Sequence, residues 1–520
     1  MNELRDVARW GTPAAAVTLS PDVRDLLGAA LGVTGPRPAA STVTLPAVTL
    51  DETVLEDLRT ACPALSTGDD GRLAHAAGKS TEDLLRLRAG QAGDAPDAVA
   101  RPATQQQVTD LLAVCSRHRV AVVPFGGGTS VVGGLAARRD GFTGVLAVDL
   151  AALDRLVHLD PVSRIATFEA GIRAPRAEEL LAAEGFTLGH FPQSFEYASL
   201  GGFAATRSSG QASSGYGRFD RMVVGLRAAT PVGPLDTGRA PESAAGPDLR
   251  QLLLGSEGAF GVITEVTVRV RPAPRARDYT GWSFPSFDAG THAVRALAQD
   301  GPLPTVLRLS DETETAINAA TGGPQSGGCL AVVGVEGTAE EVAARTAALE
   351  HRLPALGGTP LGAAPGEAWR EGRFRAPYLR DALLDAGAIA ETLETATFWD
   401  RLPATYTAVR DALTRTLSGA GTPPLVMCHI SHVYDSGASL YFTVAAAQTD
   451  DPVAQWRAAK AAAGDAIAAS GATITHHHGV GRAHLPWYTR EIGDVGVAAL
   501  RGVKNALDPH GILNPGILLP

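Results

Sequence analysis

Between residues 102 and 150, hydrophobic positions first follow helical spacing and then strand spacing. After Pro102 they recur three and four positions apart, which predicts an amphipathic helix. The short apolar runs 120–123 and 144–150 have the length and β-branched content of buried strands. Glycine dominates the start of the segment between them, so we predict the order helix, strand, glycine loop, strand. The apolar positions of the helix are Val108, Leu111, Leu112 and Cys115.

Similar patterns continue along the rest of the chain. Strands are predicted at 165–170, 223–230, 262–271, 305–309, 329–335 and 440–446. Residues 176–184 have the pattern of a helix, whereas 189–217 and 233–248 are rich in glycine, serine or proline and are predicted to be loops. The tail, 471–520, is predicted to contain short strands, a run of histidines and a helix.

The length of the chain and the breaks in its pattern predict several parts. The 520 residues exceed a typical domain, which has roughly 100–200 residues. Pro272 and Pro274 interrupt the pattern after the strand at 262–271. We predict a partly helical N-terminal region, an α+β domain, a second α+β domain and a C-terminal segment. Their expected bounds are 1–92, 93–272, 273–470 and 471–520.

Composition argues against several classes of protein. The net charge of -10 argues against a nucleic-acid-binding protein, which needs a basic face to contact phosphates. There is no apolar stretch of ~18 residues that could span a membrane. The first residues do not resemble a secretory signal, and we expect a cytoplasmic protein. The four cysteines are widely scattered, which argues against a structural zinc or iron–sulfur site.

The glycine loop is the first candidate for chemistry. It reads Gly126-Gly127-Gly128-Thr129-Ser130. Glycine lets the backbone approach a ligand closely, and successive N–H groups can then converge on a pyrophosphate. A tight turn without a ligand is the alternative. The loop lacks the Gly-Lys-Ser/Thr of a Walker A motif and the GxGxxG of a dinucleotide-binding unit. Two further glycine-rich segments, 189–217 and 254–264, favour a large ligand that is held along its length.

Three segments carry a resemblance to a known superfamily. PFGGGTSVVGGL, PQSFEYASLGGFAATRSSG and LLLGSEGAFGVITEVTVRVRP resemble, in this order, the flavin-contacting segments of the vanillyl-alcohol oxidase-type (PCMH-type) FAD-binding superfamily. With HAAGKSTEDLLRLRAG, CHISHVYDSGASLYF, THHHGVGR and LDPHGILNPG, the chain resembles the alkyldihydroxyacetonephosphate synthase (alkylglycerone-phosphate synthase) family from about residue 70 onward. The implied fold is α+β: a two-subdomain FAD-binding domain, an α+β cap domain and a C-terminal segment that returns to the flavin site.

The resemblance also implies which residues bind the cofactor. Gln193 departs from the family pattern, which usually has aspartate there, so its contribution is an open question. No cysteine or histidine lies in the glycine loop, and we expect the FAD to be non-covalent. The implied cofactor-binding residues are Pro124, Phe125, Gly126, Gly127, Gly128, Thr129, Ser130, Gln193, Ser194, Phe195, Glu196, Tyr197, Ala198, Ser199, Thr206, Arg207, Ser208, Ser209, Gly255, Ser256, Glu257, Gly258, Ala259, Phe260 and Gly261.

The run His476, His477 and His478 is the candidate for the chemical site. It could bind a metal, lie on a solvated surface or line an active site. The resemblance favours the active site, with no metal. It also aligns Tyr441 with the family's tyrosine proton acceptor and donor, and Tyr434 is the alternative. A tyrosine base needs nearby cationic groups, because the ordinary pKa of a phenol is about 10.

Two arginines are the candidates for binding the substrate. A surface salt bridge would be the default for Arg380, but by resemblance it meets the substrate phosphate, which suits the planar fork of a guanidinium. Arg308 matches a second family arginine. The implied reaction replaces the acyl group of acyl-dihydroxyacetone phosphate with a long-chain alcohol, which gives an ether lipid precursor. Tyr441 would move the C1 proton, the histidines would assist, and the flavin would serve as an electron sink without net redox change.

Three other functions stay open. The same scaffold could carry an FAD-dependent 2-hydroxy-acid dehydrogenase or oxidase of the D-lactate or glycolate type. A synthase could act on another substrate, or the protein could bind flavin without catalysis, because fold alone does not decide function. For the synthase, we expect a lipid substrate, a peripheral contact with a membrane and a homodimer, but no basic amphipathic helix stands out.

Overall fold

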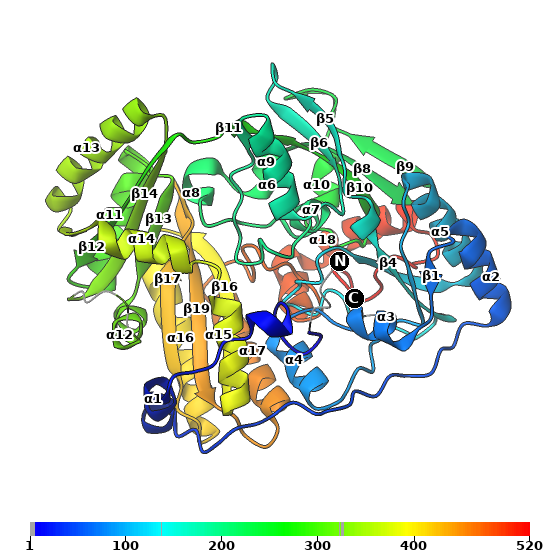
Figure 1. Ribbon diagram of the computed structural model, residues 1–520, viewed down its shortest axis with the longest axis horizontal. Coiled ribbons are helices and arrows are strands. Elements are labelled where there is room, and N and C mark those ends of the chain that lie inside the picture. The colour runs from blue at the N-terminus through cyan, green and yellow to red at the C-terminus, as the bar shows by residue number, and fades with distance from the viewer. Residues whose placement is uncertain (1–5, 137, 322, 324–326) are drawn as a thin grey trace.

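The computed structural model describes residues 6–136, 138–321, 323 and 327–520. Its helices and strands form two lobes, which Figure 1 shows side by side. One lobe contains a four-stranded and a five-stranded sheet, and the other contains an eight-stranded sheet. The predicted mixture of helices and sheets is therefore confirmed.

The four-stranded sheet leads into the predicted glycine loop. Its strand order is β1 (Leu65–Ser66), β2 (Ala98–Ala100), β4 (Gly144–Asp149) and β3 (Val120–Phe125). β2, β4 and β3 are parallel, and β1 pairs antiparallel with β2. The helices that cover it are α2 (Glu52–Ala61) and α5 (Gln105–His118), whose apolar faces share one buried core with the strands. The glycine loop begins directly after β3, as the sequence predicts.

The five-stranded sheet lies beside it in the same lobe. Its strands are antiparallel, in the order β5 (Leu156–Asp160), β6 (Ile165–Glu169), β10 (Val262–Arg269), β8 (Val223–Thr230) and β9 (Gly233–Thr237). Its core includes side chains of α6 (Ala174–Ala183) and α7 (Leu200–Thr206), and partly buried side chains of α18 (Leu485–Leu507) pack against it. A separate pair of strands is formed by β7 (Phe186–Thr187) and β11 (Arg271–Pro272).

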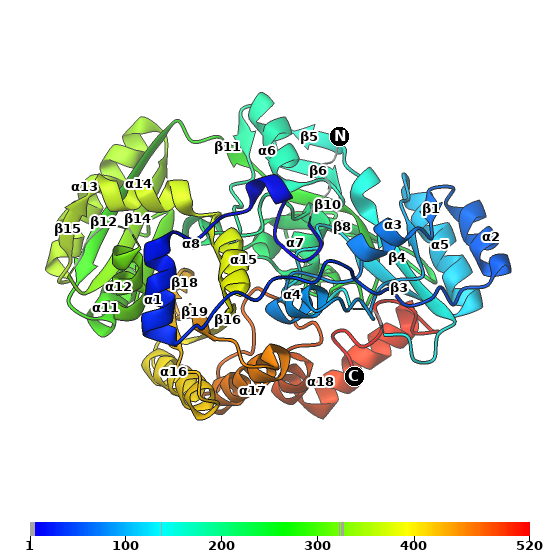
Figure 2. The same cartoon turned by 60° about the horizontal axis from the view of Figure 1, so that its bottom comes forward.

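The eight-stranded sheet forms the cap lobe. Its order is β15 (Thr359–Gly362), β12 (Ala276–Phe284), β14 (Cys329–Gly337), β13 (Val306–Ser310), β17 (Leu425–Ile430), β19 (Gly437–Ala447) and β16 (Ala388–Phe398), and β18 (Val433–Tyr434) pairs with β19. The accompanying helices are α11 (Phe287–Asp300), α12 (Glu312–Ala320), α13 (Ala339–Ala355), α16 (Leu402–Gly419) and α17 (Pro452–Ala469). In Figure 2, α16, α17 and α18 line one edge, so α17 connects the cap lobe to the other lobe.

Short elements connect these layers. They are η1 (Pro13–Ala15), α1 (Pro21–Leu31), α3 (Asp69–Ala74), α4 (Thr81–Arg88), η2 (Leu150–Ala152), α8 (Ser213–Tyr216), α9 (Phe219–Met222), α10 (Arg250–Leu253), α14 (Ala363–Gly372) and α15 (Ala376–Ala386). None of the helices in the described part of the chain has the length and apolar character that crossing a membrane requires.

Three predictions of local structure are wrong. The segment 189–217 contains α7 and α8; α7 forms despite its glycines because the Ser199 hydroxyl caps it by accepting from Gly202 N. The segment 233–248 begins with β9, which pairs with β8 at the edge of the sheet. The described tail contains no strand after residue 471. Isolated bridges form there instead, at Thr473 and Leu513.

The C-terminal segment returns to the glycine loop. Val122 N in β3 donates to Ile512 O at 2.8 Å, and Asn514 N donates to Val122 O at 2.8 Å. The Asn514 side-chain amide donates to Gly134 O at 3.1 Å and to Glu257 O at 2.7 Å. One asparagine therefore joins the glycine loop to the third glycine-rich segment, as the predicted return of the chain requires.

Candidate active site

The three predicted cofactor segments lie in direct contact. A Cβ atom on Gly126 would overlap the Ser199 hydroxyl, and one on Gly127 would overlap the Tyr197 carbonyl oxygen. A Cβ atom on Gly258 would lie 2.7 Å from the ring of Pro124. Glycine is therefore needed where each segment approaches the next. The sequence places these segments far apart, and the fold brings them together as one cradle.

Several polar groups of this cradle have no partner within the protein. Among the described residues, no acceptor lies within hydrogen-bond reach of the backbone N–H groups of Gly128, Thr129 and Ser130. The side chains of Gln193 and Ser209 each carry a buried polar atom, Nε2 and Oγ, without a hydrogen bond. Such groups cost free energy unless a ligand or water satisfies them. Converging N–H donors suit a pyrophosphate, so the residues fit FAD.

Other predicted cofactor residues hold the cradle together. Thr206 Oγ1 donates to Gly202 O, Arg207 donates to Leu254 O and Gln251, and Ser256 Oγ donates to Leu253 O. Ser208 Oγ lies 3.0 Å from His190 Nε2. Backbone hydrogen bonds link Ser194 O to Tyr197 N and Ala198 N. The predicted residues Phe125, Ala198, Ala259 and Phe260 are buried, and Gly255 and Gly261 pack closely against Arg207 and Ala228.

Phe195, Glu196 and Tyr197 extend from the second segment toward the cap lobe. The Phe195 ring stacks on Phe374 with centroids 5.6 Å apart. The Tyr378 hydroxyl donates to Glu196 at 3.0 Å and lies 3.2 Å from the Tyr197 hydroxyl. This part of the predicted cofactor shell therefore also forms the boundary with α15.

Glu257 connects the third segment to the histidine run. Its carboxylate is buried and accepts from Val480 N at 2.8 Å and Gly481 N at 2.9 Å. Burial raises the pKa of Glu257 to about 7, although these two hydrogen bonds oppose the shift. The group therefore changes its charge near neutral pH.

Glu394 on β16 holds the histidine run in place. Its buried carboxylate accepts from the backbone N–H groups of His476 at 2.5 Å, His477 at 3.2 Å and His478 at 2.9 Å. It also accepts from the Thr475 hydroxyl at 2.6 Å. Burial alone would raise the pKa of Glu394, but the hydrogen bonds from Thr475 and the backbone of the histidine run favour the ionised form, and the pKa lies well below its usual value. One ionised carboxylate therefore fixes the backbone of all three histidines.

The His476 imidazole is buried, the His477 and His478 imidazoles are largely enclosed, and all three are neutral. Burial lowers the pKa of His476, His477 and His478, the last to about 4, because charged imidazolium is disfavoured away from water. His476 is 6% exposed. The alternative of a solvated histidine run is therefore wrong. A neutral imidazole can accept a proton and donate another, which suits proton transfer.

His476 connects two other residues of the site. Its Nε2 lies 2.5 Å from the Tyr434 hydroxyl, and its Nδ1 lies 3.0 Å from His477 Nδ1. The ring of His432 stacks on His476 at 5.0 Å. Ring nitrogens of His432, His476 and His477 lie within 4.8 Å of one another, which is also the spacing of a metal-binding cluster. Metal binding would require His476 to give up one of its two hydrogen bonds.

Tyr441 packs against the same imidazoles without a hydrogen bond to them among the described contacts. Its ring stacks on His429 at 4.8 Å and on His477 at 5.9 Å, and meets the edge of His478 at 5.7 Å. Tyr441 pairs across the strands with Glu394, which explains why both face the histidine run. Burial raises the pKa of Tyr441 to about 12. The phenol is therefore protonated at neutral pH.

Arg308 contacts His429, the imidazole that stacks on Tyr441. Its guanidinium donates to Glu314 at 2.9 Å and lies 2.9 Å from His429 Nδ1. Burial would raise the pKa of Glu314, but the charge of Arg308 and the hydrogen bond with His429 hold it below its usual range. Arg308 is thus paired inside the cap sheet and orients the imidazole that stacks on Tyr441.

Arg380 on α15 is separate from this cluster. Its Nη1 donates to Lys79 O at 2.6 Å, and Lys79 N donates to Ser130 O of the glycine loop at 2.6 Å. Its Nε and Nη2 atoms are buried without a hydrogen bond. No hydrogen bond or ring contact described for this chain joins Arg380 to Tyr441. The fold therefore assembles Tyr441, the histidine run and Arg308, and places Arg380 next to the cofactor cradle.

Several residues of the site were not predicted. Glu394 and Glu314 are buried carboxylates, and His429 and His432 are buried imidazoles within the segment CHISHVY. Arg218 lies beside Tyr434, where it opposes the rise in the tyrosine pKa that burial causes. The two histidines could have been singled out from their proximity to Tyr434 in the sequence. The carboxylates carry no such signal.

Comparisons with known proteins show which family the chain resembles. Residues 96–237 match the FAD binding domain family, and residues 273–518 match the C-terminal domain of FAD linked oxidases. The chain is 35% identical over 478 residues to alkyldihydroxyacetonephosphate synthase of Trypanosoma brucei brucei, covering 86% of this chain and 77% of that protein. A solved structure of alkyldihydroxyacetonephosphate synthase superposes with a TM-score of 0.84 at 27% identity, covering 98% of this chain and 97% of that one.

A relative from another functional class is less similar. The mitochondrial cytochrome-linked D-lactate dehydrogenase of Arabidopsis thaliana is 28% identical over 479 residues, covering 90% of this chain and 79% of that protein. The predicted fold and the FAD cofactor are confirmed by these matches, and the 2-hydroxy-acid dehydrogenase is the weaker alternative.

Proposed function

The chain belongs to the alkyldihydroxyacetonephosphate synthase family, and on this premise we propose that it exchanges the acyl group of acyl-dihydroxyacetone phosphate for a long-chain alcohol. The product is an ether lipid precursor, and there is no net redox change. The observation that carries the proposal is the half-buried Tyr441, packed between His429 and a histidine run that one carboxylate fixes. This arrangement suits the transfer of protons away from water.

Tyr441 is proposed to take and return the proton at C1 of the substrate. Because its pKa of about 12 keeps the phenol protonated, it can act as a base only after its own proton moves to a neighbour. His477 and His429 stack on its ring, and burial lowers the pKa of both, so each is a neutral acceptor. Arg308 and Glu314 orient His429.

Arg380 is proposed to bind the substrate phosphate. Its Nε and Nη2 atoms make no hydrogen bond within the protein and can donate together to phosphate oxygens, while Nη1 is held by Lys79 O and Nη2 lies 3.5 Å from Asp381 Oδ1. The cradle from Pro124 to Ser130, with Gln193 to Ser199, Thr206 to Ser209 and Gly255 to Gly261, is proposed to hold the FAD without a covalent bond. When bound, the flavin supplies an electron sink for the substrate carbon.

The surroundings of the enzyme are proposed from the chemistry of the substrates. Acyl and alkyl chains partition into membranes, so we propose a peripheral contact with a membrane surface from the cytoplasm. A homodimer is proposed as well. Neither the membrane contact nor the homodimer is part of the reaction, so each is tested by a separate measurement.

The test is product formation by the purified holoprotein. Palmitoyl-dihydroxyacetone phosphate and hexadecanol should give alkyl-dihydroxyacetone phosphate and free palmitate in equal amounts, measured by mass spectrometry. The flavin absorbance should stay unchanged when D-lactate or glycolate is added without oxygen. Flavin bleaching by either acid, with no ether formed, would favour the dehydrogenase and contradict the proposal.

A further inference from the structure

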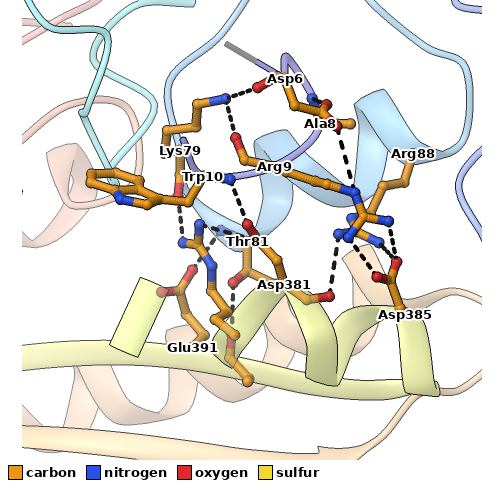
Figure 3. A network of polar contacts seen from close by, with 12 residues as sticks. Asp6, Ala8, Arg9, Trp10, Lys79, Thr81, Arg88, Asp381, Asp385 and Glu391 are labelled. Carbon is orange, nitrogen blue, oxygen red and sulfur yellow. Dashed lines mark hydrogen bonds and ion pairs between the residues drawn. The ribbon is translucent and has the colours of Figure 1, made fainter. Parts of the chain in front are cut away.

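The N-terminal segment 6–11, called the N-terminal strap below, encloses a buried lysine. Lys79 is 8% exposed, and its ammonium donates to Asp6 O at 2.9 Å, Val7 O at 2.9 Å and Arg9 O at 2.6 Å. Figure 3 shows the Lys79 side chain pointing into the turn of the strap. A buried ammonium is costly unless its donors are satisfied. The strap supplies three acceptors from its backbone, so Lys79 and the strap depend on each other.

The strap also binds α15 of the cap lobe. The Arg9 guanidinium makes two hydrogen bonds with Asp385, at 2.5 Å and 2.9 Å, and Trp10 N donates to Asp381 at 2.5 Å. Arg88 on α4 donates to the same Asp385 at 2.5 Å. Figure 3 shows Asp381 and Asp385 projecting from α15 toward the strap. These contacts fix α15 at two successive turns.

The strap has a third contact, with the cofactor cradle. The Trp10 ring meets the edge of Tyr197 with centroids 5.5 Å apart. A Cβ atom on Gly11 would lie 2.7 Å from the Tyr378 ring and 2.9 Å from the Tyr197 hydroxyl. The strap therefore lies where the second cofactor segment meets α15.

The contacts of the strap with Lys79 and with α15 both lead to Arg380. It precedes Asp381 on α15, and its Nη1 donates to the carbonyl of Lys79, whose ammonium the strap encloses. Lys79 N in turn donates to Ser130 O of the glycine loop. Arg380 Nη2 forms an ion pair with Asp381 Oδ1 at 3.5 Å, whereas Arg380 Nε and Trp10 Nε1 on the strap are buried without a hydrogen bond. These two buried donors, Arg380 Nε and Trp10 Nε1, lie on opposite sides of the contact and indicate that an acceptor from outside the protein completes it.

We propose that the N-terminal strap is a positioning element for the phosphate site. It holds Arg380 at a fixed place relative to the glycine loop, through Lys79 on one side and through Asp381 and Asp385 on the other. Arg9 and Trp10 are positioning residues that act through α15. The inference rests on the proposed function, because it assigns Arg380 to the substrate phosphate.

The experiment compares ligand binding by holoprotein variants. Arg9→Gln removes the two bonds to Asp385, Arg9→Lys retains the charge, and Arg24→Gln is a control at an exposed arginine of α1. The ligands are dihydroxyacetone phosphate and, as a probe without phosphate, dihydroxyacetone. The dissociation constants are measured from the change in flavin absorbance, and bound FAD is counted from the ratio of flavin to protein absorbance.

We expect Arg9→Gln to weaken binding of dihydroxyacetone phosphate roughly tenfold, with Arg9→Lys between it and the wild type. Arg24→Gln, the affinity for dihydroxyacetone and the FAD content should not change. Equal weakening for both ligands, or parallel loss of FAD, would show a structural role only and overturn the inference. Unchanged binding by Arg9→Gln would overturn it as well. If the wild type itself shows no preference for the phosphorylated ligand, the proposed function fails first, which separates the two outcomes.

Discussion

The hydroxyl of Tyr434 lies 2.5 Å from Nε2 of His476, and this pair is the outer end of a chain of hydrogen bonds. Tyr434 is 36% exposed, whereas His476 is buried. If the phenol donates to Nε2, the proton of neutral His476 lies on Nδ1 and is directed at His477 Nδ1, 3.0 Å away. With the protons in these positions, the Tyr434 phenol donates to His476, and His476 donates to His477. Tyr434, the alternative candidate for the base, thus has a hydrogen bond to a histidine, whereas none is described for Tyr441.

Replacing Tyr434 by phenylalanine should slow the reaction. The variant loses the donor that sets the proton on His476, so we expect kcat to fall by about one order of magnitude, within the usual range for a lost proton-transfer partner. KM and FAD content should stay constant. Tyr488→Phe is the control, because that half-buried phenol has no hydrogen bond among the described contacts. Equal kcat for both variants would exclude a role for the Tyr434 hydroxyl.

Glu394→Gln should disturb both stability and activity. Glutamine offers one acceptor oxygen instead of two, and its NH₂ group would face N–H donors of the histidine run. We expect a loss of about 1–3 kcal/mol in the free energy of unfolding for each donor left unpaired, with a large fall in kcat. The matched control is Glu491→Gln. Glu491 is exposed and binds Thr473 and Ile474 of the same segment, so it should change the melting temperature little.

Glu257 predicts how stability depends on pH. Its pKa is about 7 in the folded protein and near 4.5 in the unfolded chain, so the folded state binds the proton more tightly. The resulting stabilisation is complete below pH 4.5 and is lost as the pH rises to about 7, a loss of roughly 3 kcal/mol. Glu257→Gln cannot ionise. Relative to the wild type, the variant should therefore gain stability between pH 5 and pH 8 in urea unfolding at saturating FAD. If the free energies of unfolding of the variant and the wild type changed with pH in parallel, the raised pKa of Glu257 would be contradicted.

Gly127→Ala should weaken FAD binding. The added Cβ atom would overlap the carbonyl of Tyr197 and separate two of the three segments of the cradle. We expect a lower ratio of flavin to protein absorbance and a lower melting temperature, because backbone cannot move aside as a flexible side chain can. Gly93→Ala is the control, since a Cβ atom there meets nothing within 4 Å. Retention of FAD by both variants would show that the contact can relax.

The glycine-rich segments are easier to recognise in the sequence than the surroundings of Tyr441. Their close contacts depend on residues without a side chain, and short glycine motifs are visible in a sequence. Glu394 lies in the segment AETLETATF, whose alanine, glutamate and threonine content does not distinguish a strand from a helix. Its role depends on pairing with Tyr441, which is a matter of sheet register. The strand β17, a short apolar run with the sequence LVMCHI, was not predicted either.

The connection between Arg380 and the glycine loop is not predictable from sequence either. It depends on Lys79, which is 301 positions away from Arg380 along the chain. Such a contact follows from how the two lobes pack, and no local pattern records it. The resemblance could name Arg380 for the phosphate but gave no indication of the N-terminal strap, whose residues showed only short helical patterns and breaks.

The return of Ile512 and Asn514 to the edge of β3 has a consequence for biosynthesis. A ribosome makes the glycine loop long before it makes Asn514, so the nascent chain carries an unfinished cradle through most of translation. The bonds from Asn514 to Gly134 and Glu257 form only after that last stretch has left the exit tunnel. A chain whose translation stops before residue 514 therefore lacks the side-chain link between the first and third glycine-rich segments.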